Sequence, residues 1–274
     1  MGDWTPRELR FSNLGLRLIS SAILIPLGLA AVWAGGWGLA VACALTAGVM
    51  AWEWGHISGF TRPFLLVVFA ALTCLSLPLG MPAVSIGGLI AGAIFAALVA
   101  KGAWNHRGSA IFGLLYVTAL PASLWLLREG PWDGRSAALY FMSFVWASDA
   151  AAYFTGRGLG GPRLLPKESP NKTWSGAIGA VVACIVCGTA AADIQRVPFI
   201  GWILAGIAIS VVAQVGDLFE SGLKRRFRVK DSGTILPGHG GVMDRVDGLG
   251  AVAFISVLAF HIAPNLPDML GLQS

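Results

Sequence analysis

Long apolar runs recur along this chain from Leu18 almost to its C-terminus. A helix needs about 20 mostly apolar residues to cross roughly 30 Å of hydrocarbon. Hydrophobic residues make up 56% of the chain and charged residues 12%, about half of the roughly 25% usual in a soluble domain. The mean hydropathy is +0.72. These values predict an all-α polytopic membrane protein and exclude a soluble globular domain.

The lengths and breaks of the apolar runs predict nine transmembrane helices. Their approximate ranges are 18–34, 37–54, 63–80, 83–100, 109–127, 136–155, 174–192, 198–217 and 247–263. The basic residues test this count independently, because cytoplasmic loops accumulate Lys and Arg. With the N-terminus inside, only Arg128, Arg135 and Arg196 of the 19 basic residues fall outside. We therefore expect the N-terminus in the cytoplasm and the C-terminus outside.

The motifs divide the chain into two regions. Residues 1–130 are expected to form transmembrane helices without catalytic motifs, and residues 131–274 to form the catalytic region. The second region contains two long polar connections, 156–173 and 218–246, both on the cytoplasmic side of the predicted topology. The other connections are short turns, so a site is expected between these two.

Acidic residues stand near the cytoplasmic ends of several predicted helices. They are Glu53, Asp149, Asp217, Asp244 and Asp247. An ionisable side chain at the centre of a span costs roughly 2.5–3.5 kcal/mol, so such residues usually have a partner or a function. Glu53 ends the second predicted helix, and no further role follows for it from the sequence.

Helical spacing brings the acids of the last two helices together with basic residues. If the eighth helix continues past the interface, one of its faces holds Asp217, Ser221, Lys224 and Arg225, at i, i+4, i+7 and i+8. Asp244 and Asp247 are three residues apart and share a face of the ninth helix. Facing carboxylates repel unless a cation lies between them, and Mg²⁺ is held by one or two carboxylates plus substrate phosphates. The pattern predicts a metal-bridged phosphate site.

The connections supply groups that bind anions. The glycines of PGHGG, residues 237–241, leave backbone N–H groups free of side-chain obstruction. Lys224, Lys230 and Arg245 stand beside the acids and glycines, which favours anion contact for all three. Asn171 and Lys172 precede the seventh predicted helix, and a helix N-terminus with an adjacent lysine attracts phosphate.

Two other motifs carry no chemistry in this context. Gly156, Gly158 and Gly161 match GxGxxG, but they follow a membrane helix rather than a strand, which excludes dinucleotide binding. Cys184 and Cys187 form a CxxC inside an apolar run without a basic neighbour, which is typical of packing residues rather than of a redox site.

The segment SGLKRRFRVKDSGTILPGHGGVMDRVD, residues 221–247, resembles the signature of the phosphatidate cytidylyltransferases, also called CDP-diacylglycerol synthases. The matching positions are Ser221, Lys224, Arg225, Lys230, Asp231, Gly233, His239, Gly240, Gly241, Asp244, Arg245 and Asp247. SDAAAYFTGRGLG and SPNKTWSG resemble two further family elements. Many members have Glu or Gln at the position of Ser175 and Ser at that of Gly248, so no role is assigned to either residue.

The resemblance implies transfer of CMP from CTP to phosphatidic acid, giving CDP-diacylglycerol and pyrophosphate. It implies that Asp217, Asp244 and Asp247 bind Mg²⁺, with a second cation left open, and that Lys224 and Arg245 join them in catalysis. The expected substrate-binding residues are Ser221, Arg225, Lys230, Asp231, His239, Gly240, Gly241, Asn171, Lys172, Asp149 and Tyr153. His239 could contact phosphate, donate a proton to pyrophosphate or be structural.

The expected location is the cytoplasmic membrane of a bacterium, with the site facing the cytosol. CTP, phosphatidic acid and membrane lipids are the expected partners. Nucleic acid is excluded, and the glycine-rich apolar helices are compatible with a homodimer.

Three alternatives remain open on the sequence. A transporter would place polar groups near the midplane, whereas here they gather at one face. A relative could use another lipid, as archaeal ether-lipid cytidylyltransferases and polyprenol kinases do. A scaffold that binds anionic lipid through its basic loop would not need the interleaved carboxylates and glycines.

Overall fold

The structure is a computed structural model that describes residues 20, 22–100, 104–235 and 240–273. Its helices are an N-terminal helix at Ala22–Ala34, α2 at Gly36–Ile57, α3 at Pro63–Ser76 followed by the one-turn η1 at Leu77–Leu79, α4 at Pro82–Val99, α5 at Trp104–Glu129, α6 at Gly134–Leu159, α7 at Trp174–Gln195, α8 at Phe199–Arg226, α9 at Met243–Ile262 and α10 at Leu266–Met269. A described helix overlaps each of the nine predicted ranges.

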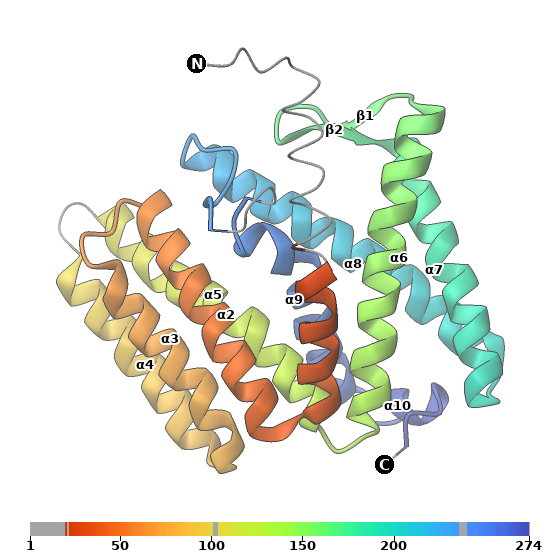
Figure 1. Cartoon of the computed structure of the whole chain (residues 1–274), viewed down its shortest axis with the longest axis horizontal. Helices are drawn as coiled ribbons and strands as arrows, with labels where there is room; N and C mark the ends of the chain where they lie inside the picture. Colours follow the sequence, from red (N-terminus) through yellow and green to blue (C-terminus); the bar gives the residue numbers. More distant parts are fainter. Residues whose placement is uncertain (1–19, 21, 101–103, 236–239, 274) are drawn as a thin grey trace.

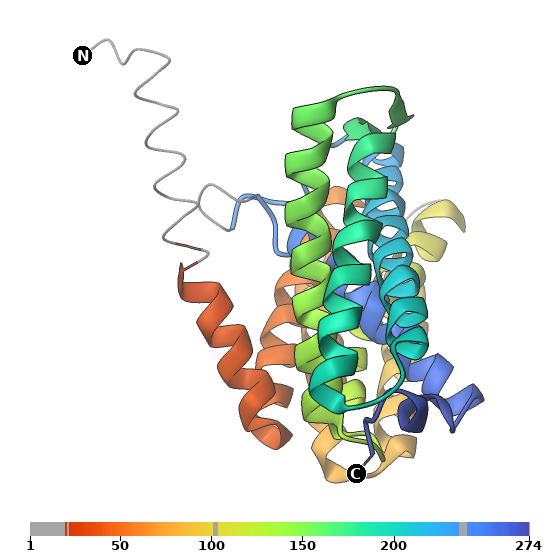
Figure 2. The ribbon, with the colours of Figure 1, turned by 90° about the vertical axis from the view of Figure 1, so that its right-hand side faces the viewer.

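The helices form two groups joined by α9. Figure 1 shows α2 to α5 on one side of the molecule and α6 and α7 on the other, with α8 and α9 between them. Turned by 90°, the molecule shows α6, α7 and α8 packed side by side (Figure 2). Because α9 packs against both α5 and α8, the groups that α8 and α9 carry can meet in the middle of the molecule.

The structure corrects the predicted 218–246 connection. α8 continues to Arg226 instead of ending near residue 217, and α9 begins at Met243 instead of 247. The polar end of α8 stays helical because residues four apart pair along it, as Glu220 and Lys224 do at 3.2 Å. The connection that is left spans residues 227–242.

The structure agrees with the all-α prediction and adds one small sheet to the helices. Residues Arg163–Leu165 form β1 and Ser169–Thr173 form β2, an antiparallel pair in which Arg163 lies opposite Thr173. This hairpin lies within the predicted 156–173 connection and leads directly into α7. The Thr173 hydroxyl accepts a hydrogen bond from the N–H of Gly176 at 3.1 Å and so caps α7.

In the described residues, six helices are long and apolar enough to cross a membrane: α2, α4, α7, α8, α9 and residues Arg107–Glu129 of α5. The N-terminal helix and Pro63–Leu79 are apolar but shorter, and α6 is not among the six. Many large apolar side chains point outward, such as Leu98, which is 75% exposed, as lipid contact requires. The chain is therefore an integral membrane protein, while the count of nine spans stays a prediction.

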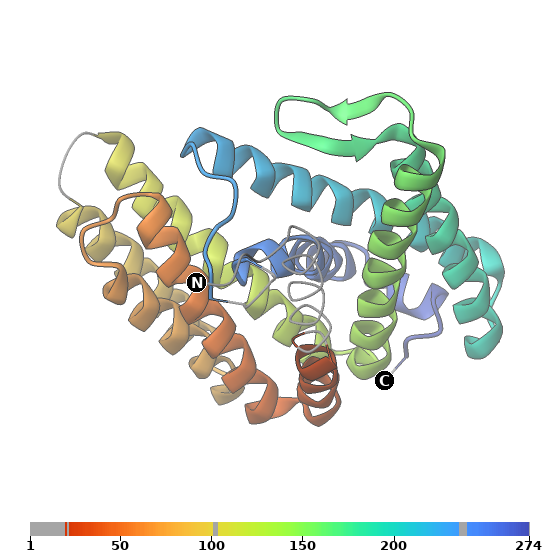
Figure 3. The ribbon, with the colours of Figure 1, turned by 45° about the horizontal axis from the view of Figure 1, so that its top comes forward.

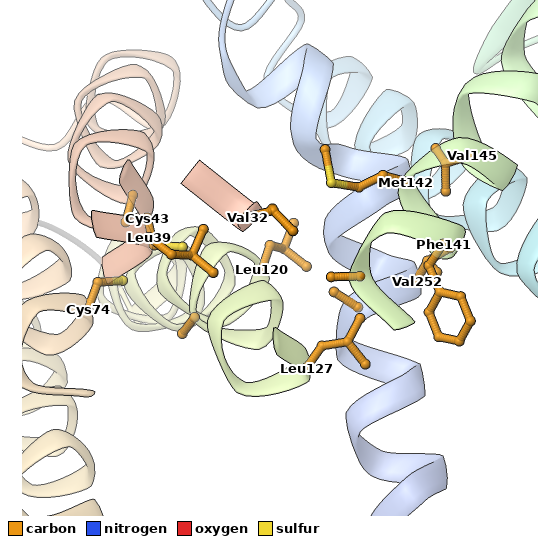
Figure 4. Packing of buried hydrophobic residues seen from close by; sticks show 14 of the residues in the cluster. Val32, Leu39, Cys43, Cys74, Leu120, Leu127, Phe141, Met142, Val145 and Val252 are labelled. Carbon is orange, nitrogen blue, oxygen red and sulfur yellow. The ribbon is translucent and has the colours of Figure 1, made fainter. Parts of the chain in front are cut away.

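A continuous apolar core joins the two helix groups. Figure 4 shows side chains of the N-terminal helix, α2, α3, α5, α6 and α9 meeting there. Cys43 and Cys74 lie in this core, and all four cysteines are free thiols, as the sequence indicated for Cys184 and Cys187. Glycine allows close contact elsewhere: a Cβ on Gly206 would lie 2.5 Å from the carbonyl oxygen of Cys184, so α7 and α8 touch through their backbones.

Replacement of Gly113 by Ala is expected to destabilise the protein by about 1–3 kcal/mol, as overpacking of a filled core does. A Cβ there would lie 1.7 Å from Nε1 of Trp54, which is 1% exposed and donates to the carbonyl of Ser109 at 3.0 Å. Gly108→Ala, in the same helix with open space around its Cα, is the matched control. Thermal unfolding in detergent measures the midpoints of both variants, and equal midpoints would contradict the close packing of Gly113 against Trp54.

Candidate active site

The two predicted connections meet at one end of the molecule. Viewed with that end forward, the β-hairpin lies alongside α8 (Figure 3). The Lys172 ammonium in β2 forms an ion pair with the Asp217 carboxylate in α8. Nε of Arg225 donates to the carbonyl of Glu168 at 3.3 Å. These contacts fit the prediction that both connections lie on the same side of the molecule.

One face of α8 carries the predicted polar residues. The hydroxyl of Ser221 lies 3.5 Å from Oδ1 of Asp217, one turn earlier. Nζ of Lys224 lies 3.2 Å from Oε1 of Glu220 and 2.5 Å from Oδ1 of Asp244 in α9. Lys224 therefore pairs with one carboxylate on its own helix and ties α8 to the start of α9 through the other, that of Asp244.

Asp244 organises the connection that precedes it. Its Oδ2 accepts hydrogen bonds from the backbone N–H of Ser232 at 3.1 Å and of Gly241 at 3.0 Å. Gly240 has φ +84°, and a Cβ on it would lie 3.1 Å from the same oxygen, so the chain needs glycine there. Both oxygens of Asp244 are thus already engaged by protein donors.

Asp247 lies where α9 packs closely against α8. Its Oδ1 accepts from the N–H of Gly248 at 2.7 Å, and a Cβ on Gly216 of α8 would lie 3.0 Å from its carbonyl oxygen. The charges of Asp217 and Asp149 act on the Asp247 carboxylate. Carboxylates from α6, α8 and α9 therefore repel one another here, and a cation between them would relieve the repulsion.

The structure adds Glu220 and Glu53 to the predicted site. Glu220 has an exposed fraction of 0% and faces Lys224; its position four residues before a lysine in a helix was the signal that could have found it. Glu53 is 2% exposed, and its carboxylate reaches the other end of the chain. It accepts hydrogen bonds from the N–H groups of Val242 at 2.8 Å and Met243 at 2.9 Å. The sequence marked Glu53 as an acid at a helix end but could not show this contact.

The remaining predicted residues lie around this centre or outside it. Those with exposed side chains are Asn171, Arg225, Lys230, Asp231, Arg245 and Asp149. Arg245 and Lys172 exert their charges on Asp149, which places all three near the carboxylates. Tyr153 is 56% exposed and its hydroxyl accepts from Nη1 of Arg157 at 2.7 Å, so its contacts stay on α6. His239 lies outside the described residues.

The oxygen ligands at this site suit a hard cation. Within residues 22–100, 104–235 and 240–273, no three or more His, Cys, Asp or Glu side chains are placed to hold a metal by themselves. Mg²⁺ needs fewer, because it usually keeps waters and binds one or two carboxylates plus substrate phosphates. Asp217 pairs with Lys172 and Asp247 accepts from the N–H of Gly248, whereas Asp244 is held by Lys224 and by two backbone N–H groups of the connection.

Comparison with known proteins identifies the family of this chain. The model of the cytidylyltransferase family matches residues 15–263. A phosphatidate cytidylyltransferase of Brucella suis is 39% identical over 94% of this chain and 98% of that protein. One of Brucella abortus is 40% identical over 95% and 97%, and one of Pseudomonas aeruginosa is 32% identical over 86% and 92%. This chain therefore belongs to the cytidylyltransferase family of enzymes, together with these phosphatidate cytidylyltransferases.

Proposed function

We propose that this protein transfers CMP from CTP to phosphatidic acid, giving CDP-diacylglycerol and pyrophosphate. The observation that supports this most directly is the meeting of α8 and α9 carboxylates with Lys172 and Lys224 at one end of the molecule. Matches over nearly the whole chain to phosphatidate cytidylyltransferases supply the substrate class. The competing transporter hypothesis loses support, because transporters build their sites on broken helices, whereas α8 and α9, which carry these carboxylates, are continuous.

The reaction asks the protein to bring two polyanions together. A phosphate monoester has a second pKa near 6 and is mostly a dianion at neutral pH. An oxygen of the phosphatidate phosphate can therefore attack the α-phosphorus of CTP without a protein base, as the bond to the pyrophosphate oxygen breaks. What remains is charge neutralisation and in-line positioning, which dominate phosphoryl-type transfers.

We assign Asp217 and Asp247 as the residues that would hold Mg²⁺. Bound there, the ion would neutralise phosphate oxygens and help to align the reacting groups. Asp244 has a different role in this assignment, because its oxygens fix Lys224 and the backbone of the 227–242 connection. It keeps α9 in register with α8 rather than supplying a free ligand.

The basic residues around the acids would receive the substrate phosphates. We assign Lys172, Arg225, Lys230, Arg245 and the Asn171 amide to this role, with His239 as a further candidate. Lys224 is only 9% exposed, and we assign it to holding Glu220 and Asp244 in place. With 16 of the 19 basic residues on the predicted cytoplasmic side, the site would face the cytosol, where CTP meets the lipid headgroup.

Purified protein in detergent is expected to release pyrophosphate only when CTP, phosphatidic acid and Mg²⁺ are all present. Chelation with EDTA should abolish the release, and added Mg²⁺ should restore it. Diacylglycerol and a polyprenol, in place of phosphatidic acid, test the relatives that use other lipids. Turnover with either of these but not with phosphatidic acid would overturn the proposed acceptor, and turnover in EDTA would overturn the metal assignment.

A further inference from the structure

The carboxylate of Glu53 joins α2 to the far end of the chain. It accepts hydrogen bonds from the N–H of Val242 at 2.8 Å and of Met243 at 2.9 Å, and from the hydroxyl of Ser232 at 3.1 Å. These donors lie on both described sides of the 227–242 connection. A buried charge is costly unless donors surround it, and here the donors are parts of the segment that enters the active site.

Two glycines allow this approach. A Cβ on Gly233 would lie 2.8 Å from Oε1 of Glu53, and one on Gly241 would lie 2.8 Å from Oε2. The Gly241 Cβ would also lie 1.9 Å from the hydroxyl of Ser232. The backbone therefore passes against the Glu53 carboxylate so closely on both sides that any side chain would push it away.

Glu53 supplies the N-terminal end of α9 with the acceptor that its own sequence lacks. The first N–H groups of a helix have no partner within it and carry partial positive charge. Val242, the residue before α9, makes no capping hydrogen bond with its side chain. Glu53 accepts from two of these N–H groups with a negative charge, and thereby fixes the turn that carries Asp244 and precedes Asp247.

A neighbouring contact on α2 supports the same role. Trp54 is 1% exposed and meets Phe227 edge to face at a centroid distance of 5.4 Å. Phe227 directly follows α8. The last turns of α2 thus hold the connection both where it leaves α8, through Trp54, and where it enters α9, through Glu53.

We propose that Glu53 is a positioning residue for nucleotidyl transfer, which holds the start of α9 so that Asp247 meets Asp217 across the helix interface. This inference rests on the proposed function. It assigns an active-site role to a helix within residues 1–130, where the sequence carries no catalytic motif. Glu53 acts through α9 and contacts no reacting group.

Glu53→Gln tests the inference with little change in volume. An amide has only one accepting oxygen, so its NH₂ group would face a backbone N–H donor in place of one of the present hydrogen bonds. We expect kcat to fall about 10- to 100-fold and the half-saturating Mg²⁺ concentration to rise by a similar factor, as when an outer partner of a metal ligand is lost. The KM for phosphatidic acid should stay within about threefold.

Glu129→Gln is the matched control. Glu129 accepts from the N–H of Gly36 at 2.8 Å, so it also contacts a helix N-terminus from another helix, but at the opposite end of α2. The Glu129→Gln variant should have a lower thermal midpoint than the wild type and an unchanged kcat and Mg²⁺ dependence. Wild-type kinetics in folded Glu53→Gln, or equal losses in both variants, would overturn the inference.

Two further measurements keep the test decisive. If Glu53→Gln does not fold, Ser232→Ala removes one of its donors, and an unchanged Mg²⁺ dependence in that variant would count against the role of Glu53. Amide hydrogen exchange at Val242 and Met243 needs no substrate, and Glu53→Gln should accelerate it at least about tenfold. Inactive wild-type protein with these amides protected would reject the proposed function alone, whereas unchanged exchange would reject the positioning role.

Discussion

Asp217→Asn and Asp247→Asn are each expected to lower the rate of CMP transfer by about 100- to 1000-fold, a loss typical of removing one preorganised electrostatic contact to a transition state. The amide keeps the volume of the side chain but removes one of the two charges that would hold Mg²⁺. In Asp217→Asn, Lys172 also loses its ion-pair partner. Pyrophosphate release at saturating CTP, titrated with Mg²⁺, measures the rate and the metal affinity together.

Asp193→Asn is the matched control, because Asp193 is an exposed acid near the opposite end of α7 from Lys172. The Asp193→Asn variant should turn over CTP at the wild-type rate. The half-saturating Mg²⁺ concentration should rise in Asp217→Asn and Asp247→Asn but much less in Asp244→Asn, which loses contacts to Lys224 and the backbone instead. The reverse order would make Asp244 the metal ligand and Asp247 the residue that only supports it.

Most of the helices could be predicted from the sequence, because the length of an apolar run and the spacing of its residues along a helix are local properties. A described helix overlaps every predicted range, and α4, predicted at 83–100, spans Pro82–Val99. The predicted element bounds are wrong in the polar segments, where hydropathy does not determine the secondary structure. α8 extends to Arg226 because side-chain pairs such as Glu220 with Lys224 stabilise its polar end, and the β1–β2 hairpin forms in a segment too polar and too short for any periodic pattern to show.

The placement of Asp217, Ser221 and Lys224 on one face of α8 could be predicted, because spacing along a single helix defines its faces. The partners of these residues could not be predicted in the same way. Glu53 lies 189 residues from Val242, whose N–H it accepts, and no local pattern encodes such a contact. Lys224 was predicted to bind phosphate. In the structure it is buried and pairs with the carboxylates of Glu220 and Asp244.

Lys224→Met is expected to destabilise the protein by about 3–5 kcal/mol, the usual cost of removing one member of a buried ion pair. The side chains of Lys224, Glu220 and Asp244 are 11%, 0% and 8% exposed. Within the described residues, the Glu220 oxygens accept no hydrogen bond, so Lys224 is the cation they face. Denaturation by SDS in mixed micelles measures the loss of unfolding free energy.

Two comparisons show whether the burial of the Lys224 ion pair causes the expected loss of stability. Lys172→Met breaks an ion pair whose side chains are 28% and 38% exposed, so it should cost no more than about 1 kcal/mol. The double variant Lys224→Met/Glu220→Gln removes one of the two carboxylates that lose their ammonium partner, while Asp244 keeps its two backbone donors. It should recover at least about half of the lost stability. Equal losses for Lys172→Met and Lys224→Met would show instead that solvent reaches the Lys224 pair. If the double variant regains stability but not CMP transfer, Lys224 also contributes to the reaction, because its structural role has then been replaced while its charge has not.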